Sequence, residues 1–155
     1  MEYKNLIVEA LNEFPEFLEE YSKISDEQNS LISKPIHLHE FHMQVCERIM
    51  HNNPTPSIYQ FYEDVIRYHF IKLIDVYNID EGNEATIEKI TKMVEFFEKM
   101  ALSGDVDVEN VLLIGIFEGI IDDKNKLKTI LTLLKEKSRL LLYKLQNYHD
   151  VNFSE

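Results

Sequence analysis

Residues 105–123 read DVDVENVLLIGIFEGIIDD and form the most apolar stretch of the chain. From residue 111 to residue 121 the only charged or polar side chain is Glu118, so no polar stripe is left to face solvent. We predict a buried central helix, because the run is longer than a typical strand and Asp107 can cap its start. A buried strand is the alternative, since Val, Leu and Ile follow one another without a clear helical period.

Three positions in this run constrain what packs around it. Gly115 and Gly119 lie one helical turn apart, so a neighbouring helix could approach closely there. Glu118 would be a charge in a buried wall, and a buried carboxylate must pair, accept hydrogen bonds or stay protonated. We therefore predict a structural ion pair with Arg139 or a hydrogen bond from Tyr143, or else a carboxylate at the edge of the core. A catalytic acid and a partner-binding role are the less favoured alternatives, since no second acid or base is placed beside Glu118.

Composition points to a single helical domain. Residues 1–155 are enough for one core, and a hydrophobic fraction of 45% excludes a disordered chain. Four Gly and four Pro leave few turns for an all-β protein. Cys46 is the only cysteine, which fits a reducing compartment. The sequence also lacks a signal-peptide pattern and an uncharged apolar run of about 18 residues, so we expect a cytoplasmic protein.

The formal net charge of −12 is distributed unevenly. Residues 78–123 hold twelve acidic residues and three lysines, and residues 1–23 hold six acidic residues and two lysines. Residues 124–155 are basic, with seven Lys or Arg against three acids. A field this negative repels nucleic acid and anionic membranes, so we expect neither as a partner, whereas it attracts a basic protein. Solubility alone is an equally good explanation of the charge.

Apolar residues at helical spacing predict four helical units. An N-terminal helix over 1–22 should bend at Pro15. Helical hairpins follow over 36–77 and 84–122, and a single C-terminal helix covers 124–148. Along that last helix an apolar residue recurs every seven positions, at Leu127, Leu134, Leu141 and Tyr148. The predicted fold is all-α, either a compact bundle or a short HEAT-like α-solenoid of about six helices.

Three groups of acidic residues are candidate binding surfaces for a basic partner. They are Glu9, Glu13, Glu16 and Glu20 on the N-terminal helix; Asp80, Glu81, Glu84 and Glu88 around a predicted loop; and Asp105, Asp107 and Asp122 flanking the central helix. Most such groups are merely solvated faces of a protein, and the sequence does not select among the three.

One cluster has the chemistry of metal ligands. His39, His42 and Cys46 share roughly one face of a predicted helix, and imidazole and thiolate groups together can hold zinc. The segment lacks the His-Glu-x-x-His spacing of zinc proteases, so ordinary packing is the preferred interpretation and we expect no cofactor. A small metal-binding enzyme or sensor at this cluster is the alternative function.

The stretch VEFFEKMALSGDVDVENVLLIGIFEGIIDD, followed by a Leu-rich helix, resembles small acidic all-helical bacterial proteins. Some of these are regarded as immunity proteins of polymorphic toxin systems. The shared pattern covers residues 93–123: a helix, a short turn, Asn110, an apolar run and Glu118. The resemblance implies a structural pattern and assigns no catalytic residues.

The sequence therefore predicts a non-enzymatic, acidic protein-binding module. Its expected partner is a basic protein, most concretely a toxin domain that it neutralises, and we expect a monomer or weak dimer. Two alternatives remain: the metal-dependent protein described above, and a helical scaffold or regulatory module whose leucine stripe reaches outward to a second copy.

Overall fold

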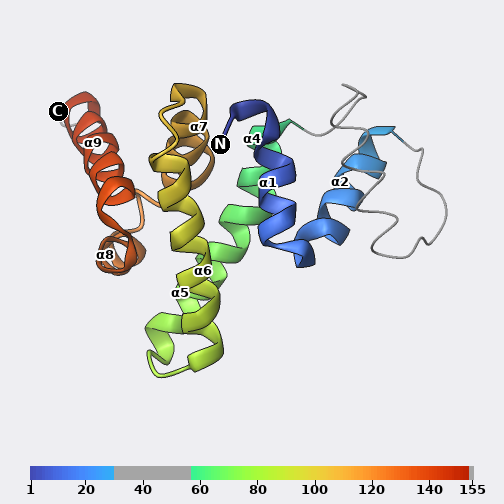
Figure 1. The fold of residues 1–155 in the computed structure, drawn as a ribbon. Coiled ribbons are helices and arrows are strands. Elements are labelled where there is room, and N and C mark those ends of the chain that lie inside the picture. The colour runs from blue at the N-terminus through green and yellow to red at the C-terminus, as the bar shows by residue number, and fades with distance from the viewer. Residues whose placement is uncertain (30–56, 154–155) are drawn as a thin grey trace.

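The computed structural model describes residues 1–29 and 57–153, with side chains for residues 1–24 and 57–150 (Figure 1). The helices are α1 (Leu6–Glu13), α2 (Leu18–Asn29), α4 (Ile58–Phe61), α5 (Tyr68–Ile79), α6 (Glu84–Ala101), α7 (Val106–Asn110), α8 (Lys124–Leu133) and α9 (Glu136–Phe153). Two 3-10 turns, η1 (Tyr3–Asn5) and η2 (Pro15–Phe17), and two π-helical segments, η3 (Tyr62–Arg67) and η4 (Val111–Phe117), complete the regular structure. All regular elements in this described part are helical, which confirms the predicted all-α class.

The predicted bend in the N-terminal helix is present. Phe14 leaves the helical region, with φ −126° and ψ 70°, and Pro15 then begins η2. Because proline lacks an N–H and fixes φ, it suits this first position and could not have continued α1. The bend turns α2 away from α1 (Figure 1).

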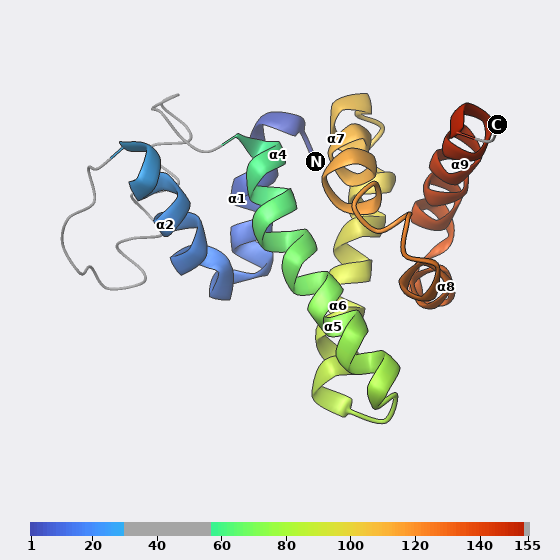
Figure 2. The same ribbon diagram turned by 180° about the vertical axis from the view of Figure 1, so that it is seen from behind.

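The second helical unit is a continuous rod built from α4, η3 and α5, which runs between α1 and α6 (Figure 2). Ser57 caps its start by accepting a hydrogen bond from the Gln60 N–H at 2.9 Å. The first half of the predicted 36–77 hairpin, residues 36–56, lies outside the described residues.

The central stretch is helical through α7 and η4, but Asp105 caps it rather than Asp107. The Asp105 carboxylate accepts hydrogen bonds from the N–H groups of Asp107 at 2.9 Å, Val108 at 3.4 Å and Tyr3 at 3.2 Å. Asp105 therefore also ties the N-terminal turn to the central helix. The bond from the Tyr3 N–H is the main cause that lowers the carboxyl pKa of Asp105.

The prediction that Glu118 is a buried charge is wrong. Glu118 is exposed, and Ile114, one turn earlier, is 43% exposed, so this face of η4 points to solvent. Arg139 is half-buried on α9, and its guanidinium donates to the Leu134 carbonyl. Both side chains are described and no ion pair joins them. Other helices cover η4 on one side only. A residue in an apolar stretch of sequence is therefore not necessarily buried.

The close helix approach predicted at the two glycines is present. A Cβ placed on Gly115 would lie 3.2 Å from the Tyr62 Cβ, and one on Gly119 would lie 2.5 Å from the Arg67 guanidinium. Segment η4 thus packs directly on η3. The Tyr62 hydroxyl donates to the Leu6 carbonyl at 2.9 Å, which links η3 to α1, and burial raises the Tyr62 pKa well above its ordinary value.

An aromatic cluster joins the central elements of the core. The ring of Phe97 on α6 meets Phe70 of α5 edge-on at a centroid distance of 5.0 Å and Phe117 of η4 at 6.3 Å. All three side chains are fully buried. The cluster holds α5, α6 and η4 together, and aromatic rings favour such edge-to-face contacts.

The prediction of one C-terminal helix over 124–148 is wrong. The chain leaves the helix at Leu134, where ψ is 148°, and α9 begins at Glu136. Glu98 of α6 stabilises this break. Its carboxylate accepts hydrogen bonds from the N–H groups of Lys137 and Ser138, each at 2.9 Å, and from the Ser138 hydroxyl at 2.8 Å. A side chain from another helix therefore caps the start of α9.

This break also removes the basis of the scaffold alternative. The seven-residue repeat is divided between two helices, and its three leucines are buried, with exposed fractions of 7%, 1% and 5% for Leu127, Leu134 and Leu141. An outward-facing stripe of these leucines is therefore absent.

Candidate functional site

The four acidic residues of the N-terminal group do not form one ridge. The bend places Glu9 and Glu13 on α1, both half-buried, and Glu16 on η2, where it is exposed. Glu20 on α2 is bound to His69 of α5, with 2.6 Å between Oε1 and Nε2. The structure thus separates this group into residues with different surroundings.

The third group is divided as well. Asp105 is half-buried and serves as the cap of α7, so its carboxylate is occupied. Asp107 and Asp122 are exposed, but they lie on opposite sides of η4 in the chain. A partner surface that uses all three carboxylates equally is therefore not supported.

The second group occupies the turn between α5 and α6, which projects beyond the rest of the described chain in both views (Figures 1 and 2). Asp80, Glu81, Glu84 and Glu88 are all exposed. Within the described residues none of these four carboxylates forms an ion pair. The turn itself is well defined, because Asp80 accepts the Gly82 N–H at 3.2 Å and Asn83 caps α6 by accepting the Thr86 N–H at 3.1 Å.

Exposed apolar side chains accompany these carboxylates. Ile79 is 88% exposed, more than any other large hydrophobic residue of the described chain, and Val76 and Ile87 are 43% and 40% exposed. We call the set Val76, Ile79, Asp80, Glu81, Glu84, Ile87 and Glu88 the hairpin tip. Val76 and Ile87 fall on apolar patterns of helical spacing in the sequence, whereas Ile79 does not. The available signal was an isoleucine within an otherwise polar loop, which costs free energy unless something covers it.

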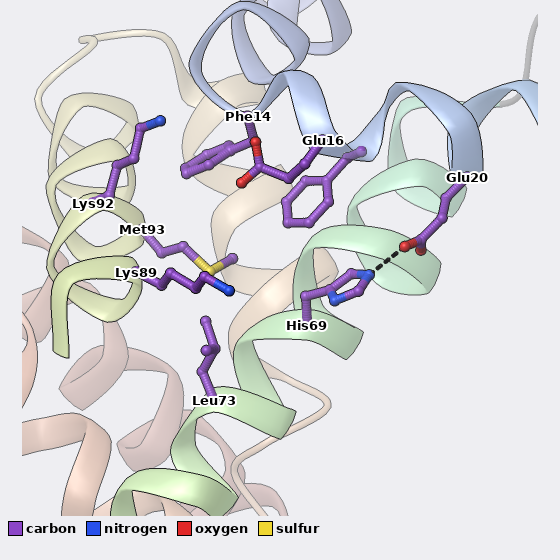
Figure 3. Close-up of a pocket in the computed structure, with 9 residues that line it drawn as sticks. Phe14, Glu16, Glu20, His69, Leu73, Lys89, Lys92 and Met93 are labelled. Atoms are coloured by element: carbon purple, nitrogen blue, oxygen red, sulfur yellow. Dashed lines mark hydrogen bonds and ion pairs between the residues drawn. The ribbon is translucent and has the colours of Figure 1, made fainter. Parts of the chain in front are cut away.

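A pocket of about 250 Å³ lies where η2 and α2 meet α5 and α6 (Figure 3). It is lined by Phe14, Glu16, Phe17, Glu20, His69, Leu73, Lys89, Lys92 and Met93. Only Glu16 and Glu20 of these were candidate site residues in the sequence. No sequence pattern links His69 to the N-terminal segment.

Two contacts hold one wall of this pocket. The His69 ring stacks on Phe17, with centroids 4.7 Å apart and planes 20° from parallel, while its Nε2 meets the Glu20 carboxylate. On the other side the Lys92 ammonium lies 5.4 Å from the centroid of the Phe14 ring, within cation–π range. The pocket therefore combines an aromatic floor with charged groups at its edges.

The candidate metal ligands His39, His42 and Cys46 lie outside the described residues. In the described part of the chain, whose side chains are those of residues 1–24 and 57–150, no three His, Cys, Asp or Glu side chains are grouped closely enough to hold a metal ion. Nor does any helix of that part combine the length and apolar character that crossing a bilayer requires.

These features define an all-α protein with an acidic, partly apolar hairpin tip and a small charged pocket. The chain belongs to the family described as Domain of unknown function (DUF7674), whose model matches residues 7–150. No curated protein and no solved structure matches the chain.

Proposed function

We propose that this protein is a non-enzymatic binding module that recognises a basic protein through the hairpin tip. The observation that carries the proposal is Ile79, which is 88% exposed next to the Asp80 and Glu81 carboxylates, and neither of these has an ion-pair partner in the described chain. An apolar anchor within a charged rim is the arrangement that protein interfaces favour. The carboxylates would accelerate encounter with a basic surface, and burial of Ile79 would slow release.

The most concrete partner is a toxin domain, which the module would neutralise by covering a basic active-site surface. A stable interface buries roughly 800 Å² on each partner, which is more than three apolar side chains supply. The hairpin tip therefore acts as the central anchor of a larger contact. A cytoplasmic location and a monomeric or weakly dimeric state belong to the same proposal.

A binding role is favoured over catalysis by the contents of the pocket. Its lining includes the His69–Glu20 pair, but none of the described lining residues carries a hydroxyl or thiol that such a pair could activate.

Charge reversal of the tip is expected to weaken partner binding strongly. The triple variant Glu81→Lys, Glu84→Lys and Glu88→Lys should lower the association rate by about tenfold or more at low salt, because it replaces attraction by repulsion. Ile79→Asp should raise the dissociation rate, also by about tenfold, because it removes the buried anchor. Both rates can be measured by surface plasmon resonance against the protein recovered from native cells with the purified chain.

The matched control carries the same change in net charge elsewhere. Glu19, Asp64 and Glu118 are exposed acids away from the hairpin tip, and changing all three to lysine should leave the association rate within about threefold of the original. Equal losses in the two triple variants would show that only overall charge matters. Unchanged binding in both the tip triple variant and Ile79→Asp would remove the proposed surface.

A further inference from the structure

The pocket between η2, α5 and α6 has the size of a small metabolite. Its volume of about 250 Å³ falls below the roughly 300–1,000 Å³ typical of pockets for drug-sized ligands. The pocket therefore suits a ligand smaller than a typical drug-sized molecule.

Charges of opposite sign line this pocket. Lys89 and Lys92 come from α6, and Glu16 comes from η2 (Figure 3). Within the described chain neither ammonium group has a carboxylate partner, and Glu16 has no cation. The remaining charges are already paired, because Glu20 and His69 bind each other at 2.6 Å.

The floor between these charges is apolar. Phe14, Phe17 and Met93 are buried, with exposed fractions of 2%, 6% and 2%, and the half-buried Leu73 lies below them. Aromatic rings and a thioether bind apolar and aromatic groups well. The stacking of His69 on Phe17 and the His69–Glu20 bond hold this side of the pocket in place before any ligand arrives.

We infer that the pocket binds a free α-amino acid with an apolar or aromatic side chain. The ligand carboxylate binds Lys89, the Lys92 ammonium beside Phe14 adds positive charge, the ligand ammonium group binds Glu16, and the ligand side chain lies on Phe14 and Phe17. A simple anion would leave Glu16 unpaired and repelled, and a simple cation would do the same to the lysines. Only a zwitterion complements both sides. This inference is independent of the hairpin tip and of any protein partner.

Isothermal titration of the full chain with L-phenylalanine tests the inference. We expect saturable binding in the millimolar range or tighter. The analogues 3-phenylpropionate, which lacks the ammonium group, and 2-phenylethylamine, which lacks the carboxylate, should each bind about tenfold more weakly. No saturable heat from L-phenylalanine would overturn the inference. Equal affinity for all three probes would reduce the pocket to a hydrophobic cleft and would overturn it as well.

Variants then assign the two charged sides. Lys89→Gln with Lys92→Gln should weaken L-phenylalanine about tenfold and leave 2-phenylethylamine unaffected, whereas Glu16→Gln should weaken the zwitterion and spare 3-phenylpropionate. Lys99→Gln, an exposed lysine of α6 outside the pocket, is the control. An equal loss in that control would contradict the assignment. All four substituted side chains are exposed, so circular dichroism should confirm an unchanged fold.

Discussion

Phe97→Ala is expected to lower the free energy of unfolding by about 3–5 kcal/mol, the largest effect of any substitution considered for this chain. The Phe97 ring is fully buried and makes edge-to-face contacts with both Phe70 and Phe117. Its removal leaves a cavity among α5, α6 and η4, and each of those elements loses packing at once. Because a typical domain is stable by only about 5–15 kcal/mol, the variant should be partly unfolded at modest denaturant concentrations.

Urea unfolding followed by circular dichroism measures this effect, and Ile87→Ala is the matched control. Ile87 lies on the same helix but is 40% exposed, so its truncation should cost under about 1 kcal/mol. If Phe97→Ala does not fold, Phe97→Leu keeps most of the volume and should cost less, about 1–2 kcal/mol. Equal costs for Phe97→Ala and Ile87→Ala would contradict the position of this ring at the centre of the core.

The sequence predicted those elements whose signals are local. The first helix of the predicted 84–122 hairpin is α6, which runs over Glu84–Ala101, since its apolar residues recur at helical spacing and Asn83 and Gly104 bound it. The bend at Pro15 follows from the missing N–H of proline alone. The close approach at Gly115 follows from a missing side chain. Each of these predictions depends on a few neighbouring residues and on nothing distant.

The break at Leu134 had no local signal. Residues 124–148 contain neither proline nor glycine, and their apolar spacing is compatible with one continuous helix. The group that stabilises the new helix start is the Glu98 carboxylate, 39 and 40 residues earlier in the chain than its two backbone donors. Helix propensity is a weak preference, and one well-placed tertiary cap was sufficient to override it.

The candidate site was predictable in part for a similar reason. The acidic residues of the hairpin tip are visible in the sequence, but their selection depends on Ile79 being uncovered, and only the path of α5 and α6 determines that. The pocket is even harder to predict from the sequence, because its residues come from four separate elements, η2, α2, α5 and α6. Glu20 and His69 are 49 residues apart in the chain, and no periodicity joins them.

Glu98→Ala is expected to lower the free energy of unfolding by about 1–3 kcal/mol, because it leaves the N–H groups of Lys137 and Ser138 without their acceptor at the start of α9. The exposed Glu95, one turn earlier on α6, contacts Lys135 at 3.6 Å and is the matched control. Glu95→Ala removes only a surface ion pair and should cost under about 1 kcal/mol. Thermal unfolding of both variants, with native-state hydrogen exchange at the amides of Lys137 and Ser138, would separate a lost cap from a lost charge. Equal exchange rates in the two variants would contradict the capping role.

The same cap makes stability depend on pH in a defined direction. Burial by itself raises the Glu98 pKa, but the hydrogen bonds from Ser138 and Lys137 and the charge of Lys135 outweigh it, so the folded-state pKa lies below the ordinary value. A lowered carboxyl pKa contributes stability that is fully present above the unfolded-state value of about 4.3. That contribution is lost as the pH falls through the lower, folded-state pKa.

Comparison of the original chain with Glu98→Gln isolates this contribution. Other carboxylates with lowered pKa are common to both proteins and cancel in the difference between them. The difference in unfolding free energy should therefore be constant from pH 7 to about 5 and should shrink below about pH 4.3. A difference that persists unchanged to pH 3 would mean that the ionised carboxylate is not what holds the start of α9.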